Sequence, residues 1–156
     1  MKAYESNFTI LIVDDDKGHV ELLRRNLSRI ALGNPILALH DGKQALDYIF
    51  RRGEFAGRTG SDPLMLLDIN MPGSIGGVEV LRQIKADPAT SKTPVIMLST
   101  TDDPREVALC YELGCSVYIT KPVDPLQFIE SIKRLGFFLQ IIRLPEDEQK
   151  AAAAAS

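Results

Sequence analysis

Four short apolar runs in this sequence are followed directly by residues suited to metal and phosphate chemistry. These residues are Asp14-Asp15-Asp16, Asp68-Ile69-Asn70, Ser99-Thr100 and Lys121-Pro122. Carboxylate oxygens are ligands that Mg²⁺ prefers, and Mg²⁺ commonly binds one or two carboxylates together with a substrate phosphate. A lysine ammonium is a second, compact positive charge for a phosphoryl oxygen. If these groups meet, they can hold Mg²⁺ beside a phosphoryl group.

The groups can act together only if the fold brings the ends of the apolar runs to one place. Helical periodicity separates the runs: between residues 17 and 30, for example, Val20, Leu23 and Leu27 share one helical face. We expect strands at Phe8–Val13, Ile36–His40, Leu64–Asp68, Pro94–Leu98 and Val117–Ile119, each followed by a helix. Such alternation predicts a parallel sheet with helices on both faces, whose ligands bind at the carboxyl ends of the strands. The polar residues are therefore expected at one edge of the sheet.

Several of these residues also have simpler interpretations. An acidic residue after a strand is often only the N-cap of the next helix, and we assign that role to Asp16 and Asp41. Ser99 alone is equally consistent with a capping hydroxyl, and Lys121 with a surface lysine. Their functional interpretation depends on the complete set.

The histidines and cysteines add no second site. His19 and His40 are isolated in the sequence, and nothing in it supports a metal-binding or acid–base role for them. Cys110 and Cys115 are too few for a disulfide framework and have no metal-ligand company. We expect them to be small buried thiols.

The composition limits the class of protein. The chain has 156 residues, of which 45% are hydrophobic and 25% charged, as in an ordinary single globular domain. A net charge of −3 argues against nucleic-acid binding by bulk electrostatics. No apolar run approaches the roughly 20 residues that cross a bilayer, and the first residues lack the pattern of a signal peptide. We expect a cytoplasmic protein that binds neither nucleic acid nor membrane.

The segments VDDD, LLDINMP, LST and ITKP stand, in this order, at the expected strand ends. Together they resemble the receiver domain of two-component response regulators, over residues 9–135. The resemblance implies a flavodoxin-like, doubly wound sheet of five parallel strands in the order 2-1-3-4-5. It implies one domain over residues 1–145, including an extended C-terminal helix. Residues 146–156 form a polar, alanine-rich tail, either a frayed helix or an addition made for expression.

The resemblance gives the acidic residues and the lysine their roles. Asp68 matches the phosphoacceptor, whose carboxylate attacks phosphorus. Asp14 and Asp15 match the acidic pair of the Mg²⁺ site, in which Asp15 binds the ion directly and Asp14 mainly through water. Asp68 and the backbone carbonyl of Asn70 complete the implied ligands. Lys121 matches the lysine that bridges Asp68 and the phosphoryl oxygens.

The resemblance also implies a switch. Ser99 matches the hydroxyl that bonds the new phosphoryl group, and Thr100 contributes its backbone N–H. Tyr118 matches a residue that rotates into the space vacated when Ser99 moves toward the phosphoryl group. The Lys121–Pro122 peptide matches a cis bond that aims the lysine.

The implied function is that of a single-domain response regulator in a two-component phosphorelay. A phosphohistidine on a sensor histidine kinase supplies the phosphoryl group to Asp68 in a Mg²⁺-dependent reaction. The protein is then a signalling phosphoprotein rather than an enzyme, with its own self-phosphorylation and autodephosphorylation chemistry. The face formed by the fourth helix, the fifth strand and the last helix is expected to bind the partner.

Three features depart from the minimal pattern. The loop Arg51–Pro63 is longer than usual, the loop Met71–Gly77 has one extra residue, and the segment Phe137–Ile142 is apolar on all sides. The long loop, the YITKP strand and the apolar segment are similar to small regulators paired with bacterial phytochrome-type histidine kinases. That similarity implies a homodimer through the output face, with the apolar segment contributing. The alternative is that the segment folds back on its own domain.

Two other classes of function compete with a receiver: an enzyme and a constitutive adaptor. A phosphatase of the haloacid-dehalogenase kind also uses an aspartate nucleophile, but it needs a second aspartate two residues later, where this chain has Asn70. A nucleotide hydrolase would need a P-loop glycine–lysine motif, which the sequence lacks. A constitutive adaptor could keep the fold without phosphorylation, although the complete acidic set argues against it.

Overall fold

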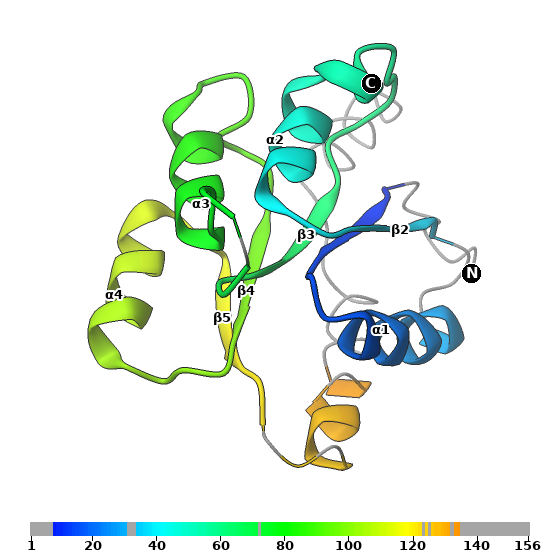
Figure 1. The fold of residues 1–156 in the computed structure, drawn as a ribbon, viewed down its shortest axis with the longest axis vertical. Helices are drawn as coiled ribbons and strands as arrows, with labels where there is room; N and C mark the ends of the chain where they lie inside the picture. Colours follow the sequence, from blue (N-terminus) through cyan, green and yellow to red (C-terminus); the bar gives the residue numbers. More distant parts are fainter. Residues whose placement is uncertain are drawn as a thin grey trace, which may run out of the picture.

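The computed structural model describes residues 8–30, 34–71, 73–122, 124, 126–131 and 133–134. Its strands are β1 (Ile10–Val13), β2 (Ile36–Leu39), β3 (Leu64–Asp68), β4 (Val95–Ser99) and β5 (Val117–Thr120). Its helices are α1 (Lys17–Ile30), α2 (Gly42–Phe50), α3 (Gly77–Ala86) and α4 (Pro104–Leu113), with a short 3₁₀ turn η1 (Gly53–Phe55). Residues 126–131 and 133–134 are also helical (Figure 1).

The five strands form one parallel sheet in the order β2-β1-β3-β4-β5. This order confirms the doubly wound, flavodoxin-like fold expected from the resemblance. Val13 pairs with Leu67, and Ser99 pairs with Thr120, so neighbouring strands end side by side. The residues that follow β1, β3, β4 and β5 therefore start from one edge of the sheet.

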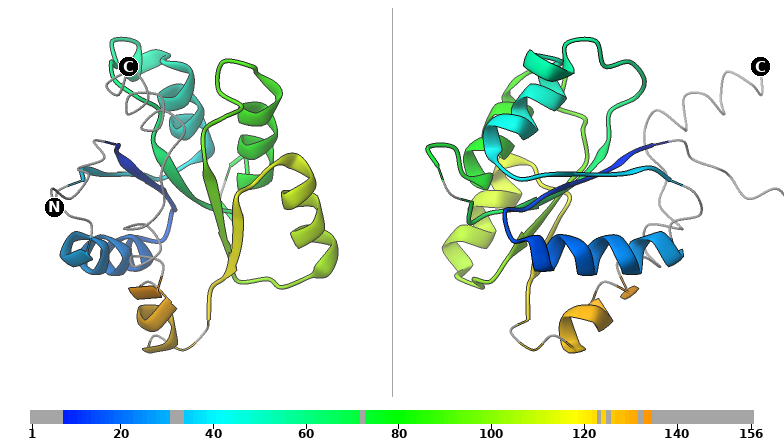
Figure 2. Two further views of the ribbon diagram at one scale, coloured as in Figure 1. Left: turned by 180° about the vertical axis from the view of Figure 1, so that it is seen from behind. Right: turned by 45° about the vertical axis from the view of Figure 1, so that its right-hand side comes forward.

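Helices cover both faces of the sheet. Helices α2, α3 and α4 lie on one face, while α1 and the helical residues 126–131 and 133–134 lie on the other (Figures 1 and 2). Alternate residues of β1 and β3 supply the two cores because successive side chains in a strand point to opposite faces. Leu11 and Met65 belong to the first core, and Ile10 and Leu64 to the second. This two-sided burial explains why both strands are continuously apolar.

The polar residues expected to cap helices do so. Oδ1 of Asp16 accepts hydrogen bonds from the backbone N–H groups of Gly18 and His19, at 2.9 and 3.2 Å. Oδ1 of Asp41 accepts one from the N–H of Gln44 at 2.7 Å. These bonds satisfy donors that the first helical turn leaves free, so both assignments are confirmed.

The two cysteines meet at the end of α4. The N–H of Cys115 donates to the carbonyl of Cys110 at 3.0 Å, across a Gly114 whose φ is 108°. This is the Schellman arrangement, in which these two positions commonly form an apolar contact. Both thiols are free and buried, as expected, and burial raises the pKa of Cys110 to about 11.

The long loop Arg51–Pro63, expected to be polar and irregular, contains an ordered centre around Arg58. Its side chain is only 8% exposed. The Arg58 guanidinium donates to the backbone carbonyl of Tyr48 at 2.8 Å and lies 4.4 Å from the centre of the Tyr48 ring. The loop connects the end of α2 to the start of β3, so it lies away from the carboxyl ends of the strands. The extra residues thus extend the domain without entering the predicted site.

The chain end is described only in part. Phe128 is 5% exposed and packs in the core on the α1 side. The apolar segment 137–142, the domain end at 145 and the tail 146–156 all lie outside the described residues. Within the described part, no helix is long and apolar enough to cross a membrane.

Candidate functional site

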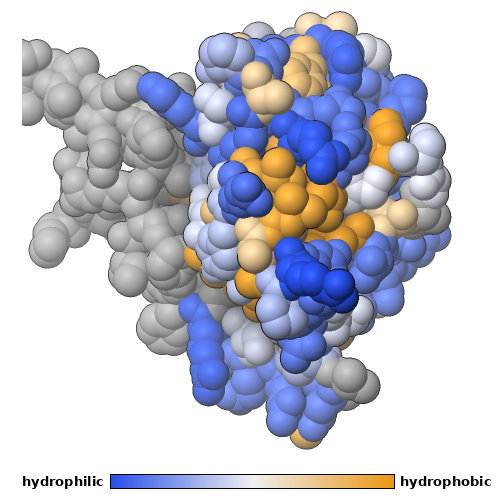
Figure 3. Space-filling view, turned by 90° about the vertical axis from the view of Figure 1, so that its left-hand side faces the viewer, coloured by the Kyte–Doolittle hydropathy of each residue, from blue (hydrophilic) through white to orange (hydrophobic). Residues whose placement is uncertain are grey.

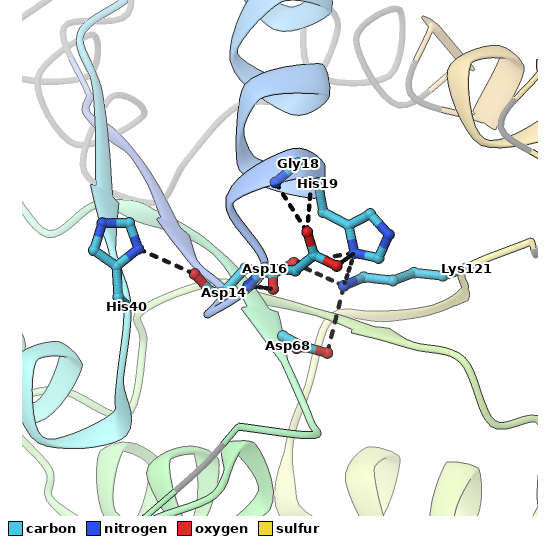
Figure 4. A network of polar contacts seen from close by, with 7 residues as sticks. All are labelled: Asp14, Asp16, Gly18, His19, His40, Asp68 and Lys121. Carbon is cyan, nitrogen blue, oxygen red and sulfur yellow. Dashed lines mark hydrogen bonds and ion pairs between the residues drawn. The ribbon is translucent and has the colours of Figure 1, made fainter.

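Four of the predicted site residues are buried together at the carboxyl ends of the strands. Asp14 follows β1, Asp68 ends β3, Ser99 ends β4 and Lys121 follows β5, with exposures of 1%, 6%, 0% and 4%. Asp15, Asn70 and Thr100 are exposed beside them. The sheet thus brings together the carboxylates and the lysine at one edge (Figure 4).

Three carboxylates face one another. Asp14, Asp15 and Asp68 each offer an oxygen, and these atoms all lie within 4.8 Å of one another. The two oxygens of Asp14 are already engaged: Oδ1 accepts from the N–H of Asp16 at 2.9 Å, and Oδ2 from Nζ of Lys121 at 2.7 Å. Clustered carboxylates repel one another unless positive charge lies among them. Their oxygens suit a hard divalent cation, so the residues present fit such an ion.

Lys121 is the cation that the chain itself supplies. Its Nζ lies 2.7 Å from Oδ2 of Asp14 and 3.5 Å from Oδ1 of Asp68. Its backbone N–H donates to the carbonyl of Ser99 at 2.5 Å, which continues the β4–β5 pairing. The position of the lysine therefore depends on the strand pairing as well as on its charge partners.

The Lys121–Pro122 bond does not have the expected conformation. Among the described residues, no peptide bond is cis, so the expectation of a cis bond there was wrong. The trans form of an X–Pro bond is intrinsically favoured by about 0.5–1 kcal/mol. Nζ of Lys121 nevertheless reaches Asp14 and Asp68 with this bond trans.

Asp68 has the most perturbed carboxyl group of the site. Burial raises the pKa of Asp68 to about 6, and the negative charge of Asp14 acts in the same direction. The charge of Lys121 and the N–H of Asn70 oppose this rise in pKa. Most Asp68 carboxyls are thus ionised at pH 7, so the group can act as a nucleophile without a separate protein base.

Ser99 and Tyr118 meet at the loop that follows β4. The Ser99 hydroxyl accepts a hydrogen bond from the N–H of Thr101 at 3.1 Å. The Tyr118 hydroxyl donates to the carbonyl of the same Thr101 at 2.8 Å. Burial raises the pKa of Tyr118, which keeps this hydroxyl protonated and able to donate. The two predicted switch residues are therefore connected through one peptide unit.

Two glycines fix the loop that follows Asp68. The N–H of Gly77 donates to the carbonyl of Ile69 at 3.0 Å, and a Cβ at position 77 would lie 2.2 Å from the carbonyl oxygen of Asp68. A Cβ on Gly42 would lie 2.4 Å from the carbonyl oxygen of Ile75. The sequence alone assigns no role to either glycine, although the Gly-Gly pair at the start of α3 is a visible signal for Gly77.

The histidines also lie near the site, although no sequence pattern indicates a role for them. Nδ1 of His19 lies 3.3 Å from Nζ of Lys121, and Nδ1 of His40 lies 3.3 Å from the backbone oxygen of Asp14. His19 stands three residues after the capping Asp16, so the first turn of α1 points it toward the end of β5 (Figure 4). That placement requires the position of Lys121, 102 residues later in the chain.

Comparisons with known proteins agree with this geometry. The sequence pattern of the response regulator receiver domain matches residues 10–133. Response regulator Rcp1 of Synechocystis sp. is 31% identical over 139 residues, which cover 87% of this chain and 92% of Rcp1. A solved structure of the Mn²⁺-bound form of Rcp1 matches with a TM-score of 0.82 and 30% identity, covering 88% of this chain and 99% of the other.

Two further solved structures are similar over nearly the same region. A receiver domain from Rhodospirillum rubrum is 42% identical, with a TM-score of 0.80, covering 88% of this chain and 97% of the other. The phosphorylated cyanobacterial phytochrome response regulator RcpA is 32% identical, with a TM-score of 0.82, covering 90% of this chain and 99% of the other. Residues 10–133, which match the family pattern, include the whole sheet and the acidic edge described above.

Proposed function

The chain belongs to the response regulator receiver domain family, and from that premise we propose that Asp68 is its phosphoacceptor. The observation that carries the proposal is the position of the Asp68 carboxylate, whose Oδ1 lies 3.5 Å from Nζ of Lys121 and which clusters with the carboxylates of Asp14 and Asp15. Receiver domains are signalling modules of two-component systems. The phosphoryl donor would be a phosphohistidine on a sensor histidine kinase.

The proposed reaction is a direct displacement at phosphorus. An oxygen of Asp68 forms a bond to phosphorus while the bond from phosphorus to the donor imidazole nitrogen breaks, and its electron pair returns to that ring. Such transfer asks the protein mainly for positioning and for neutralisation of the equatorial oxygens. Lys121 would neutralise the charge on one phosphoryl oxygen. The Ser99 hydroxyl and the Thr100 N–H would donate hydrogen bonds to the other phosphoryl oxygens.

The acidic cluster is proposed to hold Mg²⁺. The ligands would be Asp15, Asp68 and the backbone carbonyl of Asn70, with Asp14 acting mainly through water. This difference between Asp14 and Asp15 is supported by the two carboxylate oxygens of Asp14, since both of these oxygens already accept hydrogen bonds. When bound, the ion neutralises charge on the phosphoryl oxygens. The related Rcp1 has been solved in a Mn²⁺-bound form, which supports the binding of a divalent cation by a protein of this fold.

Intact mass tests the phosphoacceptor. After incubation with Mg²⁺ and acetyl phosphate or phosphoramidate, one phosphoryl adduct is expected in the wild type and none in Asp68→Asn. Asp62→Asn, in the loop Arg51–Pro63, is the matched control and should keep the adduct. A wild type without an adduct would favour a constitutive adaptor. Steady hydrolysis of unrelated phosphate esters would favour an enzyme.

The output surface is proposed to be the face of α4 and β5. β5 is an edge strand whose residues are half-buried or exposed, so its outer edge can meet a partner, with the N–H of Tyr118 already bound by the Tyr111 hydroxyl. Val107, Leu109 and Ile119 are half-buried on the same two elements. Figure 3 shows apolar side chains gathered, within a hydrophilic surround, on the side of the molecule where α3 and α4 lie.

A second copy of the chain is the proposed occupant of this face, with the segment 137–142 contributing. Light scattering of the full chain and of a chain ending at residue 135 tests this. Loss of the dimer on truncation would support the contribution of the segment, whereas an unchanged dimer would rule it out. A phytochrome-type histidine kinase is the proposed upstream partner, because RcpA is a phytochrome response regulator. A cytoplasmic location follows from that pairing as a further prediction.

A further inference from the structure

His19 lies beside the lysine of the site and has no assigned role. Its Nδ1 is 3.3 Å from Nζ of Lys121, whereas the nearest oxygens of Asp16 and Asp14 are farther away, at 3.5 and 3.9 Å. The side chain is 35% exposed, so only part of it faces solvent. Figure 4 shows the ring turned toward the ammonium of Lys121.

The chemistry of the two groups fixes the direction of this contact. A lysine ammonium has three N–H donors and no acceptor. Lys121 has three partners at its Nζ: Asp14 at 2.7 Å, His19 at 3.3 Å and Asp68 at 3.5 Å. Nδ1 of His19 must therefore be the acceptor, with the ring proton on Nε2. Asp14 and His19 thus each accept a hydrogen bond from the ammonium, and Asp68 lies within ion-pair distance of it.

His19 is itself held from two sides. Its backbone N–H donates to Oδ1 of Asp16 at 3.2 Å, which fixes it in the capped first turn of α1. Its ring lies 5.2 Å from the ring of Phe128, centre to centre, at an angle of 46°. Phe128 is 5% exposed and belongs to the core. The acceptor nitrogen is therefore presented by a side chain with little freedom to move.

We propose that His19 is a positioning residue that orients the Lys121 ammonium between Asp14 and Asp68. The inference rests on the proposed function, because it concerns the lysine that would neutralise the phosphoryl group. With one N–H bound to Asp14 and another to His19, the ammonium stays within ion-pair distance of Asp68. Without that acceptor, the ammonium can rotate and shift toward solvent or toward Asp14 alone. A misplacement of about 1 Å can slow a reaction about 100-fold.

Two substitutions of His19 test its acceptor nitrogen and its ring contact with Phe128 separately. In His19→Asn, the amide oxygen can occupy the place of Nδ1, so the acceptor stays while the contact with Phe128 is lost. In His19→Phe, the ring contact stays while the acceptor is lost. Phosphorylation by acetyl phosphate with Mg²⁺ is followed by intact mass over time. We expect His19→Phe to be at least about tenfold slower than wild type, and His19→Asn to be within about threefold of it. Equal rates in wild type and His19→Phe, or equal slowing in both variants, would overturn the inference.

A second measurement needs no phosphorylation. In proton–nitrogen correlation spectra of lysine ammonium groups, the Lys121 signal is the one that Lys121→Met lacks. We expect this signal to be visible, through slow exchange, in the wild type and in His19→Asn, and broadened in His19→Phe. The same signal in all three proteins contradicts a positioning role. If the wild type showed no phosphoryl adduct, the proposed function would fail while this spectrum still tested His19.

Discussion

Nζ of Lys121 lies 2.7 Å from Oδ2 of Asp14, and the two side chains are only 3% and 1% exposed. Burying two charges is costly, and their attraction compensates only when the geometry and the remaining hydrogen bonds are good. Here the other oxygen of Asp14 is also bound, by the N–H of Asp16 at 2.9 Å. Removing the lysine would leave Asp14 as a buried charge without its main counter-ion.

The first prediction follows from this pair. Without divalent cations, Lys121→Met should lower the free energy of unfolding by about 3–5 kcal/mol, the usual result of breaking a buried pair. Urea unfolding measures the change. Added Mg²⁺ should restore part of the loss, since the cation would replace the missing positive charge. Lys92→Met, at an exposed position in the α3–β4 connection, is the control and should change stability by less than about 0.5 kcal/mol. Equal effects of the two substitutions would contradict the role of the pair.

The second prediction concerns pH. The pKa of Asp68 is about 6 in the folded chain, against 3.8 for an unperturbed aspartate. The folded state therefore holds a proton that the unfolded state releases, so stability from this group is present below about pH 4 and is lost as pH rises to about 6. Asp68→Asn should then stabilise the metal-free protein by about 2–3 kcal/mol at pH 7.5 and by only about 0.5 kcal/mol at pH 4.

Unfolding in a chelating buffer across this pH range provides the measurement. The matched substitution Asp62→Asn should not stabilise the protein at pH 7.5, because it removes an ion pair with Arg58 at 3.8 Å and relieves no buried charge. Saturating Mg²⁺ should reduce the advantage of Asp68→Asn, because the ion favours the ionised carboxylate. An advantage that grew toward low pH would have the wrong sign and would refute the assignment.

The third prediction tests the loop after Asp68. Gly77→Ala should destabilise the domain by about 1–3 kcal/mol, since its Cβ would lie 2.2 Å from the carbonyl oxygen of Asp68. It should also slow phosphorylation, because relief of the clash must move the backbone that carries the nucleophile. Gly57→Ala is the control, as a Cβ there meets nothing within 4 Å. Thermal unfolding and the intact-mass time course together decide the outcome: a normal rate in Gly77→Ala would separate the loop from the chemistry.

Sequence patterns predicted the features that depend on local structure. Alternating apolar runs predicted the strands, and the placement of Asp16 and Asp41 predicted the helix caps, because both signals arise within a few residues. The strand order came from the family resemblance, since periodicity does not say which strands are neighbours. Strand ends differed by one or two residues: β1 begins at Ile10 and β4 ends at Ser99, for instance.

Contacts between distant segments were beyond such patterns. His19 contacts Lys121 because the pairing of β5 with β4 places Lys121 beside the first turn of α1. Arg58 is buried because the carbonyls at the end of α2 accept its N–H groups, although its sequence neighbours predict an exposed loop. Gly77 is needed because the start of α3 approaches the backbone of Asp68 closely. In each case the atom that the residue contacts belongs to a distant segment, and the local sequence does not show that this segment lies nearby.

The fourth prediction connects the site to the proposed output face. The Tyr118 hydroxyl donates to the carbonyl of Thr101 at 2.8 Å, and the N–H of Thr101 donates to Ser99 at 3.1 Å. If Ser99 moves toward a phosphoryl group, this peptide and the tyrosine should move with it. Tyr118→Phe removes the connection at a cost to stability of about 1 kcal/mol. It should therefore weaken the change in dimerisation that phosphorylation causes, rather than dimerisation itself.

Light scattering at matched concentrations, with and without acetyl phosphate and Mg²⁺, measures that change. Tyr111→Phe is the matched control, because its hydroxyl lies on the same face and accepts the N–H of Tyr118 at 3.1 Å without contacting Thr101. The control should respond to phosphorylation as the wild type does. A wild-type response in Tyr118→Phe would show that the signal leaves the site by another route. A response lost in both variants would point to the β5 backbone rather than to the Thr101 contact, because Tyr111 reaches only the N–H of residue 118.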